Sequence, residues 1–387
     1  MVAYPDDWEV SKIEKIADIT TGCRDTQDNK SNAKYPFFVR SPIVERIDIS
    51  DFDCEAVLTA GDGVGTGKVF HYINGKFAAH QRVYVMSNFK NVDGKYFYYY
   101  FSSNFGKEVE KYTAKSSVDS VRRDMIAEMD FPYPPLPEQK AVVSLLSDFD
   151  AHINNLTKLI EKKKAIRDGA LEDLVSGRTR IKGFDKEWET VSFDQVIRPK
   201  ARIGWQGLKK EEYLRDGYSY LIGGTDFHNG KINLDGISYV SKERYDMDPN
   251  IQVEANNVLV TKDGTIGKVA LVPELDKPAT LNSGVFVFRT TSKLLPTFLY
   301  RVLLSSIFRE FIETLSAGST IKHLYQKDLK NFEFRIPLDI EEQQAIADVL
   351  TAMDEEIEAL EKEKAKIESI KEGAMYDLLT GRVRLKI

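Results

Sequence analysis

The sequence predicts an α/β (α+β) protein with two similar globular domains, separated by two long helices that form an antiparallel coiled coil. Three observations lead to this fold class: an internal repeat, an apolar seam along each copy of the repeat, and β-rich runs mixed with helical stretches before each copy. The chain has 387 residues, 42% of them hydrophobic, which is enough to fill the cores of two or three domains.

The repeat is found by comparing the chain with itself. A shift of 204 residues (342 minus 138) aligns residues 138–182 with 342–386 without a gap, and 18 of the 45 paired positions are identical. The identical pairs include Glu138-Gln139 with Glu342-Gln343, Gly169-Ala170 with Gly373-Ala374, and Gly177-Arg178 with Gly381-Arg382. Self-similarity over this length indicates two copies of one structural unit.

Each copy has the apolar spacing of a coiled-coil helix, which alternates between four and three residues. The seam residues are Val142, Leu146, Phe149, Ile153, Leu156, Ile160, Ala170 and Leu174 in the first copy, and Ile346, Leu350, Met353, Ile357, Leu360, Ile367, Ala374 and Leu378 in the second. Pro132, Pro134, Pro135 and Pro137 end any helix upstream of the first copy. Gly177 and Gly381 are expected as C-terminal caps, so each helix has about 40 residues.

The two helices are expected to pair with one another. Residues 138–180 hold 8 basic and 7 acidic residues, a net charge of +1, whereas residues 342–384 hold 6 and 11, a net charge of −5. This difference favours pairing between the two copies. The alternative is two surface helices that each pack on their own domain.

The segments before the helices correspond more faintly. The matching strings are Trp8-Glu9 with Trp188-Glu189, Gly67-Lys68-Val69 with Gly267-Lys268-Val269, and residues 113–117 with 316–320. Strands are predicted at 82–86 and 284–288, and helices at 96–112 and 296–315. The predicted order is a domain over 1–136, a helix over 137–180, a second domain over 181–338 and a second helix over 339–387.

Composition excludes several classes of protein. No apolar run approaches the ~20 residues that cross a bilayer, and the start of the chain is acidic, so we expect a cytoplasmic protein without membrane contact. The two cysteines, Cys23 and Cys54, are too few for a disulfide framework and lack the spacing of a zinc site. The net charge of −6 argues against binding DNA by bulk electrostatics, although contacts to base edges do not need a basic chain.

With these residues in view, the chain resembles the specificity subunit of type I restriction-modification systems. The resemblance is carried by the proline-rich lead into Glu138-Gln139 and Glu342-Gln343, by the Trp-Glu openings, and by the closing strings Leu174-Val175-Ser176-Gly177-Arg178 and Leu378-Leu379-Thr380-Gly381-Arg382. The resemblance covers nearly the whole chain. It is carried by the strings occurring twice in the same order, because each string alone is a weak indication of the family.

The resemblance implies two target-recognition domains that each read one half of an interrupted, asymmetric sequence in double-stranded DNA. It implies that the helices act as spacer and as docking surface for two methyltransferase subunits, joined by restriction and translocase subunits. The family has no catalytic centre, so this chain is expected to be no enzyme by itself and to hold no cofactor. S-adenosylmethionine, ATP and Mg²⁺ are then expected on the partner subunits.

The strings that could carry chemistry do not fit it. Residues 61–68 resemble a phosphate-binding loop, but Val69 follows where Ser or Thr is needed, and the second copy, residues 262–268, fails as well. We interpret both as glycine-rich turns between strands, or as DNA-facing loops that present Lys68 and Lys268. Pro134-Pro135 lacks the Asn or Asp of an adenine methyltransferase motif, and the five histidines show no ligand spacing, so no catalytic or metal-binding residue is predicted.

DNA contacts are expected from clusters of basic and amide side chains, which match the donor and acceptor pattern of the major groove and the charge of phosphates. In the first domain the candidates are Arg24, Gln27, Asn29, Lys30, Lys34, Lys68, His80, Gln81, Arg82, Lys115, Ser116, Ser117, Arg122 and Arg123. In the second they are Lys200, Arg202, Trp205, Gln206, Lys209, Lys210, Lys268, Ser319, Lys322, His323, Tyr325, Gln326 and Lys327. The simpler interpretation is that these loops are merely solvated.

Two other functions remain open at this point. One is a single-chain DNA methyltransferase or nuclease with its own reader, which the missing motifs disfavour. The other is a coiled-coil adaptor without DNA contact. Neither the bases read nor the length of the gap between the two half-sites follows from residue spacing.

Overall fold

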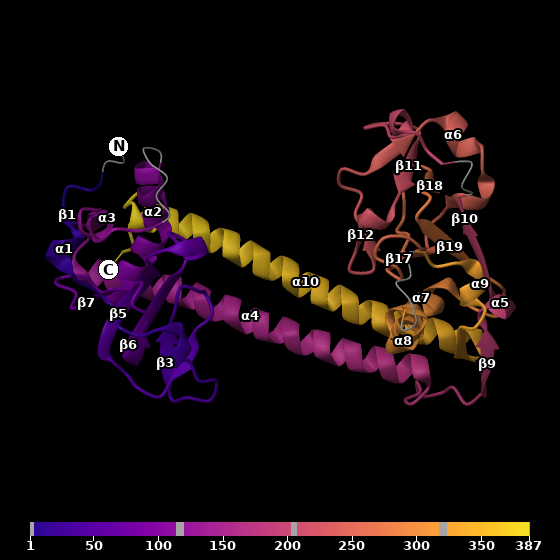
Figure 1. Ribbon diagram of the computed structural model, residues 1–387, viewed down its shortest axis with the longest axis horizontal. Coiled ribbons are helices and arrows are strands. Elements are labelled where there is room, and N and C mark those ends of the chain that lie inside the picture. Colours follow the sequence, from indigo (N-terminus) through magenta and orange to yellow (C-terminus); the bar gives the residue numbers. More distant parts are fainter. Residues whose placement is uncertain (1–3, 114–119, 203–206, 317–322, 387) are drawn as a thin grey trace. The chain divides into compact units, whose positions relative to one another are not determined.

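The computed structural model describes residues 4–113, 120–202, 207–316 and 323–386 (Figure 1). The chain divides into two compact units: unit 1 comprises Met1–Lys158 with Lys362–Ile387, and unit 2 comprises Leu159–Glu361. Helices α4 (Leu136–Ser176) and α10 (Ile340–Leu379) each contribute one half to either unit. Among the described residues, no helix is both long and apolar enough to cross a membrane.

Unit 1 is built on a six-stranded sheet with the order β2-β7-β5-β6-β3-β4. Its strands are β2 (Asp18–Thr21), β3 (Tyr35–Phe38), β4 (Glu45–Ile47), β5 (Phe52–Ala60), β6 (Phe70–Ala79) and β7 (Val83–Ser87). Helix α2 (Gly94–Thr113) packs its aromatic side chains, among them Phe97, Phe101 and Phe105, into the core. A separate pair of strands, β1 (Glu9–Lys12) and β8 (Asp130–Tyr133), and the short helices α1 (Ile13–Ile16) and α3 (Arg123–Ala127) complete the unit.

Unit 2 repeats this plan with more strands. Its sheets have the orders β10-β19-β16-β17-β13-β12 and β14-β11-β18-β15, and β9 pairs with β20. The strands are β9 (Trp188–Ser192), β10 (Ile197–Ala201), β11 (Ser219–Ile222), β12 (Phe227–His228), β13 (Lys231–Ile232), β14 (Ser238–Val240), β15 (Gln252–Val253), β16 (Val258–Thr261), β17 (Val269–Leu271), β18 (Ala279–Leu281), β19 (Val285–Thr290) and β20 (Glu333–Pro337). The helices are α5 (Phe193–Val196), α6 (Lys242–Asp246), α7 (Pro296–Leu304), α8 (Ser306–Ser316) and α9 (Gln326–Leu329).

The predicted strands at 82–86 and 284–288 are confirmed as β7 and β19, and the predicted helix at 96–112 as α2. The predicted helix at 296–315 is wrong in one respect, because it is broken at Ser305 into α7 and α8. Ser305 has an extended backbone, with φ −79° and ψ 175°. The carboxylate of Glu172, on α4, accepts hydrogen bonds from Ser306 N at 2.7 Å and Ser306 Oγ at 2.6 Å and so caps the start of α8.

The two long helices end as the sequence predicts. They contain 41 and 40 residues, and the glycines that follow them, Gly177 and Gly381, adopt left-handed backbone conformations with φ of +73° and +70°. A Cβ on Gly177 would lie 3.3 Å from the ring of Trp188, and one on Gly381 would lie 3.2 Å from the ring of Trp8. The Trp-Glu openings therefore supply the ring that packs on each helix end.

In each unit the two helices run antiparallel. In unit 1, Asp150 of α4 pairs with Lys371 of α10 at 2.5 Å. In unit 2, Lys163 of α4 pairs with Glu356 at 2.6 Å, and the later Arg167 pairs with the earlier Asp354. The helix ends also enter the domain cores: Leu146 and Leu378 belong to the core of unit 1, and Leu174 and Leu350 to that of unit 2. The helices thus pair with one another and also pack on their own domains.

The repeated Glu-Gln strings make contacts inside each unit. Glu138 is 2% exposed, and its carboxylate accepts hydrogen bonds from Arg384 Nε and Nη2, both at 2.6 Å. In unit 2, Glu342 accepts from Arg180 Nε at 2.9 Å and Nη2 at 2.6 Å. Each pair joins the start of one long helix to the segment that follows the other. The identical Glu-Gln strings of the repeat therefore stabilise the fold.

The glutamines of these strings secure the loops that precede α2 and α7. Gln139 accepts from Asp93 N at 2.8 Å and donates to the carbonyl of Pro134 at 2.8 Å. Gln343 accepts from Leu295 N at 2.8 Å and donates to the carbonyl of Pro337 at 3.0 Å. Because both side chains lie in the interior, these bonds satisfy backbone groups that would otherwise be unpaired.

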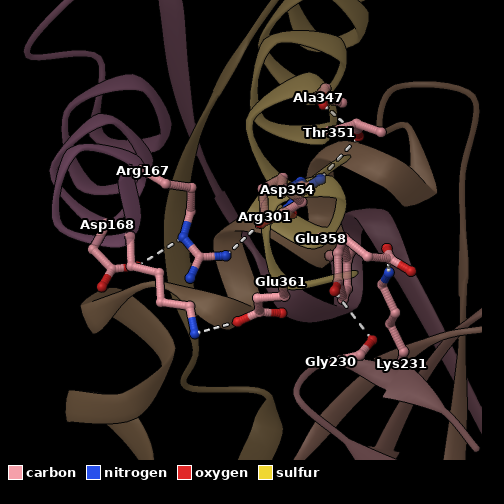
Figure 2. Close-up of polar contacts among 12 residues, drawn as sticks. Arg167, Asp168, Gly230, Lys231, Arg301, Ala347, Thr351, Asp354, Glu358 and Glu361 are labelled. Atoms are coloured by element: carbon pink, nitrogen blue, oxygen red, sulfur yellow. Dashed lines mark hydrogen bonds and ion pairs between the residues drawn. The ribbon is translucent and has the colours of Figure 1, made fainter. Parts of the chain in front are cut away.

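One carboxylate in each unit connects the domain to both long helices. Figure 2 shows the one in unit 2, Asp354. In unit 2, Asp354 accepts from Arg301 Nη1 at 2.5 Å and from Arg167, and Arg301 Nη2 donates to Thr351 at 2.8 Å. Arg301 lies on α7 and is 4% exposed. Its charge is therefore buried and depends on Asp354.

Unit 1 has the same arrangement with a different donor. Asp150, the repeat counterpart of Asp354, accepts from the Tyr99 hydroxyl of α2 at 2.6 Å and from Lys371 at 2.5 Å. Burial, reinforced by the hydrogen bond to Asp150, raises the pKa of Tyr99, so the hydroxyl remains a donor at neutral pH. A buried arginine in one unit is thus replaced by a neutral tyrosine in the other.

Candidate nucleic-acid interface

The two glycine-rich strings are turns between strands, as predicted. Residues 61–69 join β5 to β6 through a 3₁₀ turn at Gly63–Gly65, and residues 262–268 join β16 to β17. Both turns use left-handed glycines, with φ of +75° at Gly63 and +70° at Gly264. Lys68 and Lys268 are exposed at corresponding ends of these turns.

Each turn is hydrogen-bonded to the segment that precedes the last strand of its domain. Val121 N donates to the carbonyl of Gly61 at 2.7 Å, and Leu324 N donates to the carbonyl of Lys262 at 2.8 Å. The exposed Arg122 and Arg123 directly follow Val121, and the exposed His323 and Lys327 lie on either side of Leu324. Lys115, Ser116, Ser117, Trp205, Gln206, Ser319 and Lys322 lie outside the described residues.

In unit 1 the turn holds a carboxylate between two guanidinium groups. Asp62 accepts from Arg40 Nη1 at 2.8 Å and from Arg82 Nη1. Burial disfavours the charged carboxylate, but the two guanidiniums outweigh it and lower the pKa of Asp62. A groove of about 730 Å³ beside the turn is lined by Arg40, Lys68 and Val64, among others, and Val64 is 98% exposed at its rim.

In unit 2 the corresponding carboxylate has a different partner. Asp263 binds Nδ1 of His323, and the bridge between these residues corresponds to the bridge between Asp62 and Ser120 in unit 1. Tyr325 is exposed, with the ammonium of Lys327 5.5 Å from its ring centre. A groove of about 600 Å³ at the end of this turn is lined by Lys268, His228 and Arg309, among others.

Other predicted residues lie on the surface of the two domains. Arg24 makes a bidentate pair with Asp51, with Nε 2.9 Å from Oδ2. Lys34 lies 5.2 Å from the ring centre of Tyr35, and Gln81 bonds Asp25 at 3.4 Å. Further residues that the structure places at the surface are Gln27, Asn29, Lys30, Lys200, Lys209, Lys210 and Gln326.

Two predicted DNA-binding residues are buried instead. His80 is 4% exposed, and its Nδ1 accepts a hydrogen bond from Arg82 N at 3.0 Å. Arg202 is 2% exposed and donates from Nε to the carbonyl of Leu281 at 3.0 Å. Burial lowers the pKa of both side chains. Both would have to leave the domain interior before they could contact DNA.

The sequence analysis missed the acidic residues of this surface. Asp62 lies inside the string that was compared with a phosphate-binding loop, and Arg40 is not part of any of the basic clusters that the sequence analysis selected. The aligned pair Asp62 and Asp263, each at the start of a glycine turn, is the pattern that could have revealed them. Within the described ranges, no cluster of three or more His, Cys, Asp or Glu side chains could hold a metal ion.

Comparison with known proteins finds relatives that are specificity subunits of type I restriction enzymes. The "Putative type I restriction enzyme MjaX specificity subunit" of Methanocaldococcus jannaschii is 28% identical, with 99% of this chain and 95% of that protein covered. The "Type I restriction enzyme MjaVIII specificity subunit" of the same organism is 27% identical, with 99% and 94% covered.

Solved structures share the fold at low sequence identity. The type I restriction-modification system S subunit from M. genitalium superposes with a TM-score of 0.65 at 17% identity, covering 98% of this chain and 96% of that one. A chain from a study of "complex assembly" of the type I R-M system gives a TM-score of 0.58 at 14% identity, covering 98% and 100%.

The family model for the "Type I restriction modification DNA specificity domain" matches the chain twice, over residues 5–166 and 185–369. These matches include both glycine turns and most of both long helices. The protein therefore belongs to the type I restriction-modification specificity subunits and carries two recognition domains.

Proposed function

We propose that this chain is a non-catalytic subunit that reads a bipartite, asymmetric site in double-stranded DNA and directs partner subunits to it. The observation that carries the proposal is that the corresponding glycine turns of the two units are surrounded by different side chains. Beside the turn that follows β5, Arg40 and Arg82 bind Asp62, whereas beside the turn that follows β16, His323 binds Asp263. Two similar readers with different surfaces suit two different half-sites.

The proposal extends to partners and cofactors. We infer that two methyltransferase subunits bind the chain, because the helix pair offers each of them a copy of the same repeated surface. Restriction and translocase subunits would join the same complex. S-adenosylmethionine, ATP and Mg²⁺ would then be bound by these partners and not by this chain.

We expect the isolated chain to bind DNA weakly and to gain affinity when two methyltransferase subunits are added. Its net charge of −6 offers little counterion release, so the partners must supply most phosphate contacts. Gel shifts at fixed salt, with random and with genomic DNA fragments, measure both states. The methyltransferase subunits without this chain are the control.

Nanomolar sequence-specific binding by the chain alone would show that the partners are not needed for affinity. Binding by the complex that is equal for random and genomic DNA would contradict a role in specificity. Retention of labelled S-adenosylmethionine by the isolated chain would favour the single-chain enzyme instead.

A further inference from the structure

Arg82 is the more exposed of the two arginines that bind the carboxylate of the unit 1 turn. Its side chain is 63% exposed, compared with 42% for Arg40, which shares the same carboxylate. It stands in the tight connection between β6 and β7, next to the buried His80. Its position on the surface is therefore set by the backbone of two central strands of the sheet.

The backbone of Arg82 is fixed on both sides. Its N–H donates to Nδ1 of His80 at 3.0 Å, and its carbonyl accepts from Gly61 N at 2.8 Å. The second bond ties residue 82 to the residue that precedes Asp62. Because Nδ1 of His80 accepts, the ring proton lies on Nε2, and the low exposure of His80 favours this neutral form.

The guanidinium of Arg82 is held by one edge only. Its Nη1 binds Asp62, a carboxylate with 13% side-chain exposure. No other hydrogen bond to this guanidinium exists among the described residues, so Nε and Nη2 have no partner within that part of the chain. These two atoms form the planar fork that matches O6 and N7 of guanine in the major groove.

Unit 2 lacks this side chain at the corresponding place. The bond from Lys262 N to the carbonyl of Gly284, at 2.9 Å, corresponds to the bond from Gly61 N to the carbonyl of Arg82. Gly284 therefore occupies the position of Arg82, and Asp263 binds His323 instead. A contact made by Arg82 would belong to one half-site only.

We propose that Arg82 reads a guanine in the half-site bound by unit 1, and that Asp62 is the positioning residue for its guanidinium. The inference rests on the proposed function and names the side chain and the base. A phosphate also accepts this fork, but the two contacts differ in outcome: loss of a base contact changes one position of the motif, whereas loss of a phosphate contact weakens binding to all sequences alike.

The test uses the full chain, expressed with its methyltransferase subunits in a host whose genomic DNA is then sequenced for methylated adenines. For Arg82→Ala we expect one G·C pair in one half-site to become degenerate, with a loss of discrimination of roughly 10- to 100-fold at that pair. The other half-site and the gap should stay unchanged. Arg82→Lys keeps the charge but lacks the fork, so it should not restore the guanine preference.

Two further variants separate the roles. Asp62→Asn should weaken the preference at the same base pair, because Arg82 loses its charged support. Lys76→Ala removes an exposed cation that pairs with Asp53 at the opposite end of the β5–β6 hairpin, and it should leave the motif intact. Thermal unfolding of each variant checks that the fold is kept, and Arg82→Gln replaces Arg82→Ala if the alanine variant does not accumulate.

The outcomes distinguish this inference from the proposed function. A wild-type complex that methylates no bipartite motif would overturn the proposed function. A bipartite motif that Arg82→Ala leaves unchanged, or weakens uniformly at all sites, would overturn the assignment of Arg82 alone. A uniform loss that Arg82→Lys repairs would identify a phosphate contact.

Discussion

Replacing Asp354 with Ala is expected to lower the free energy of unfolding by about 3–5 kcal/mol, because it leaves a buried charge without its partner. Arg301, whose side chain is 5% exposed, would keep its bond to Thr351 and its contact with the ring of Tyr300, neither of which carries a negative charge. Arg167 would lose its partner on α10 at the same time. Urea unfolding of the full chain, followed by circular dichroism and tryptophan fluorescence, measures the change.

The matched control is Asp150→Ala in unit 1, where the donors are the neutral Tyr99 and the partly exposed Lys371. It should cost less, about 1–3 kcal/mol, because no buried charge is stranded. Adding Arg301→Met to Asp354→Ala should recover most of the lost stability, since the apolar side chain needs no partner. Equal losses in the two single variants would show that the buried arginine is not the source of the effect.

Lengthening both long helices by four residues is expected to abolish methylation of the native site and to create a site with a longer gap. Each helix runs without a break from one unit into the other. Four residues add about 6 Å at 1.5 Å per residue. This corresponds to one to two base pairs at about 3.4 Å each.

The insertions belong after Leu156 and after Leu360, which are counterparts in the repeat, so both helices are lengthened equally. Some stability should be lost where the seam slips. Sequencing of methylated DNA should show unchanged half-sites and a gap longer by one or two base pairs. A variant that still methylates the native site would show that the helices do not set the gap.

The sequence analysis predicted the long helices well because their features are local or periodic. The apolar seam, the prolines before Glu138 and the glycine caps all lie within the segment that they shape. The break at Ser305 could not be predicted, because its cap, Glu172, lies 134 residues earlier in the chain. The pairing of Glu138 with Arg384 spans 246 residues and has no local pattern either.

The candidate site was predicted less completely for a related reason. Polar side chains suggested a surface position for His80 and Arg202, but adjacent strands and loops bury both. Asp62 can be identified as a partner of Arg40 and Arg82 only in the folded protein, because these arginines lie 22 and 20 residues away in the sequence. Composition identified the basic loops, whereas their arrangement around a carboxylate depends on strand order.

The central claim is that the two recognition domains read the two halves of one site independently. The most direct test exchanges residues 181–338 for the same region of a relative with a different motif, in a complex with the methyltransferase subunits, and sequences the methylated host DNA. The account predicts a motif in which one half-site has changed while the other half-site and the gap are kept. A motif changed in both halves, or in neither, would contradict it.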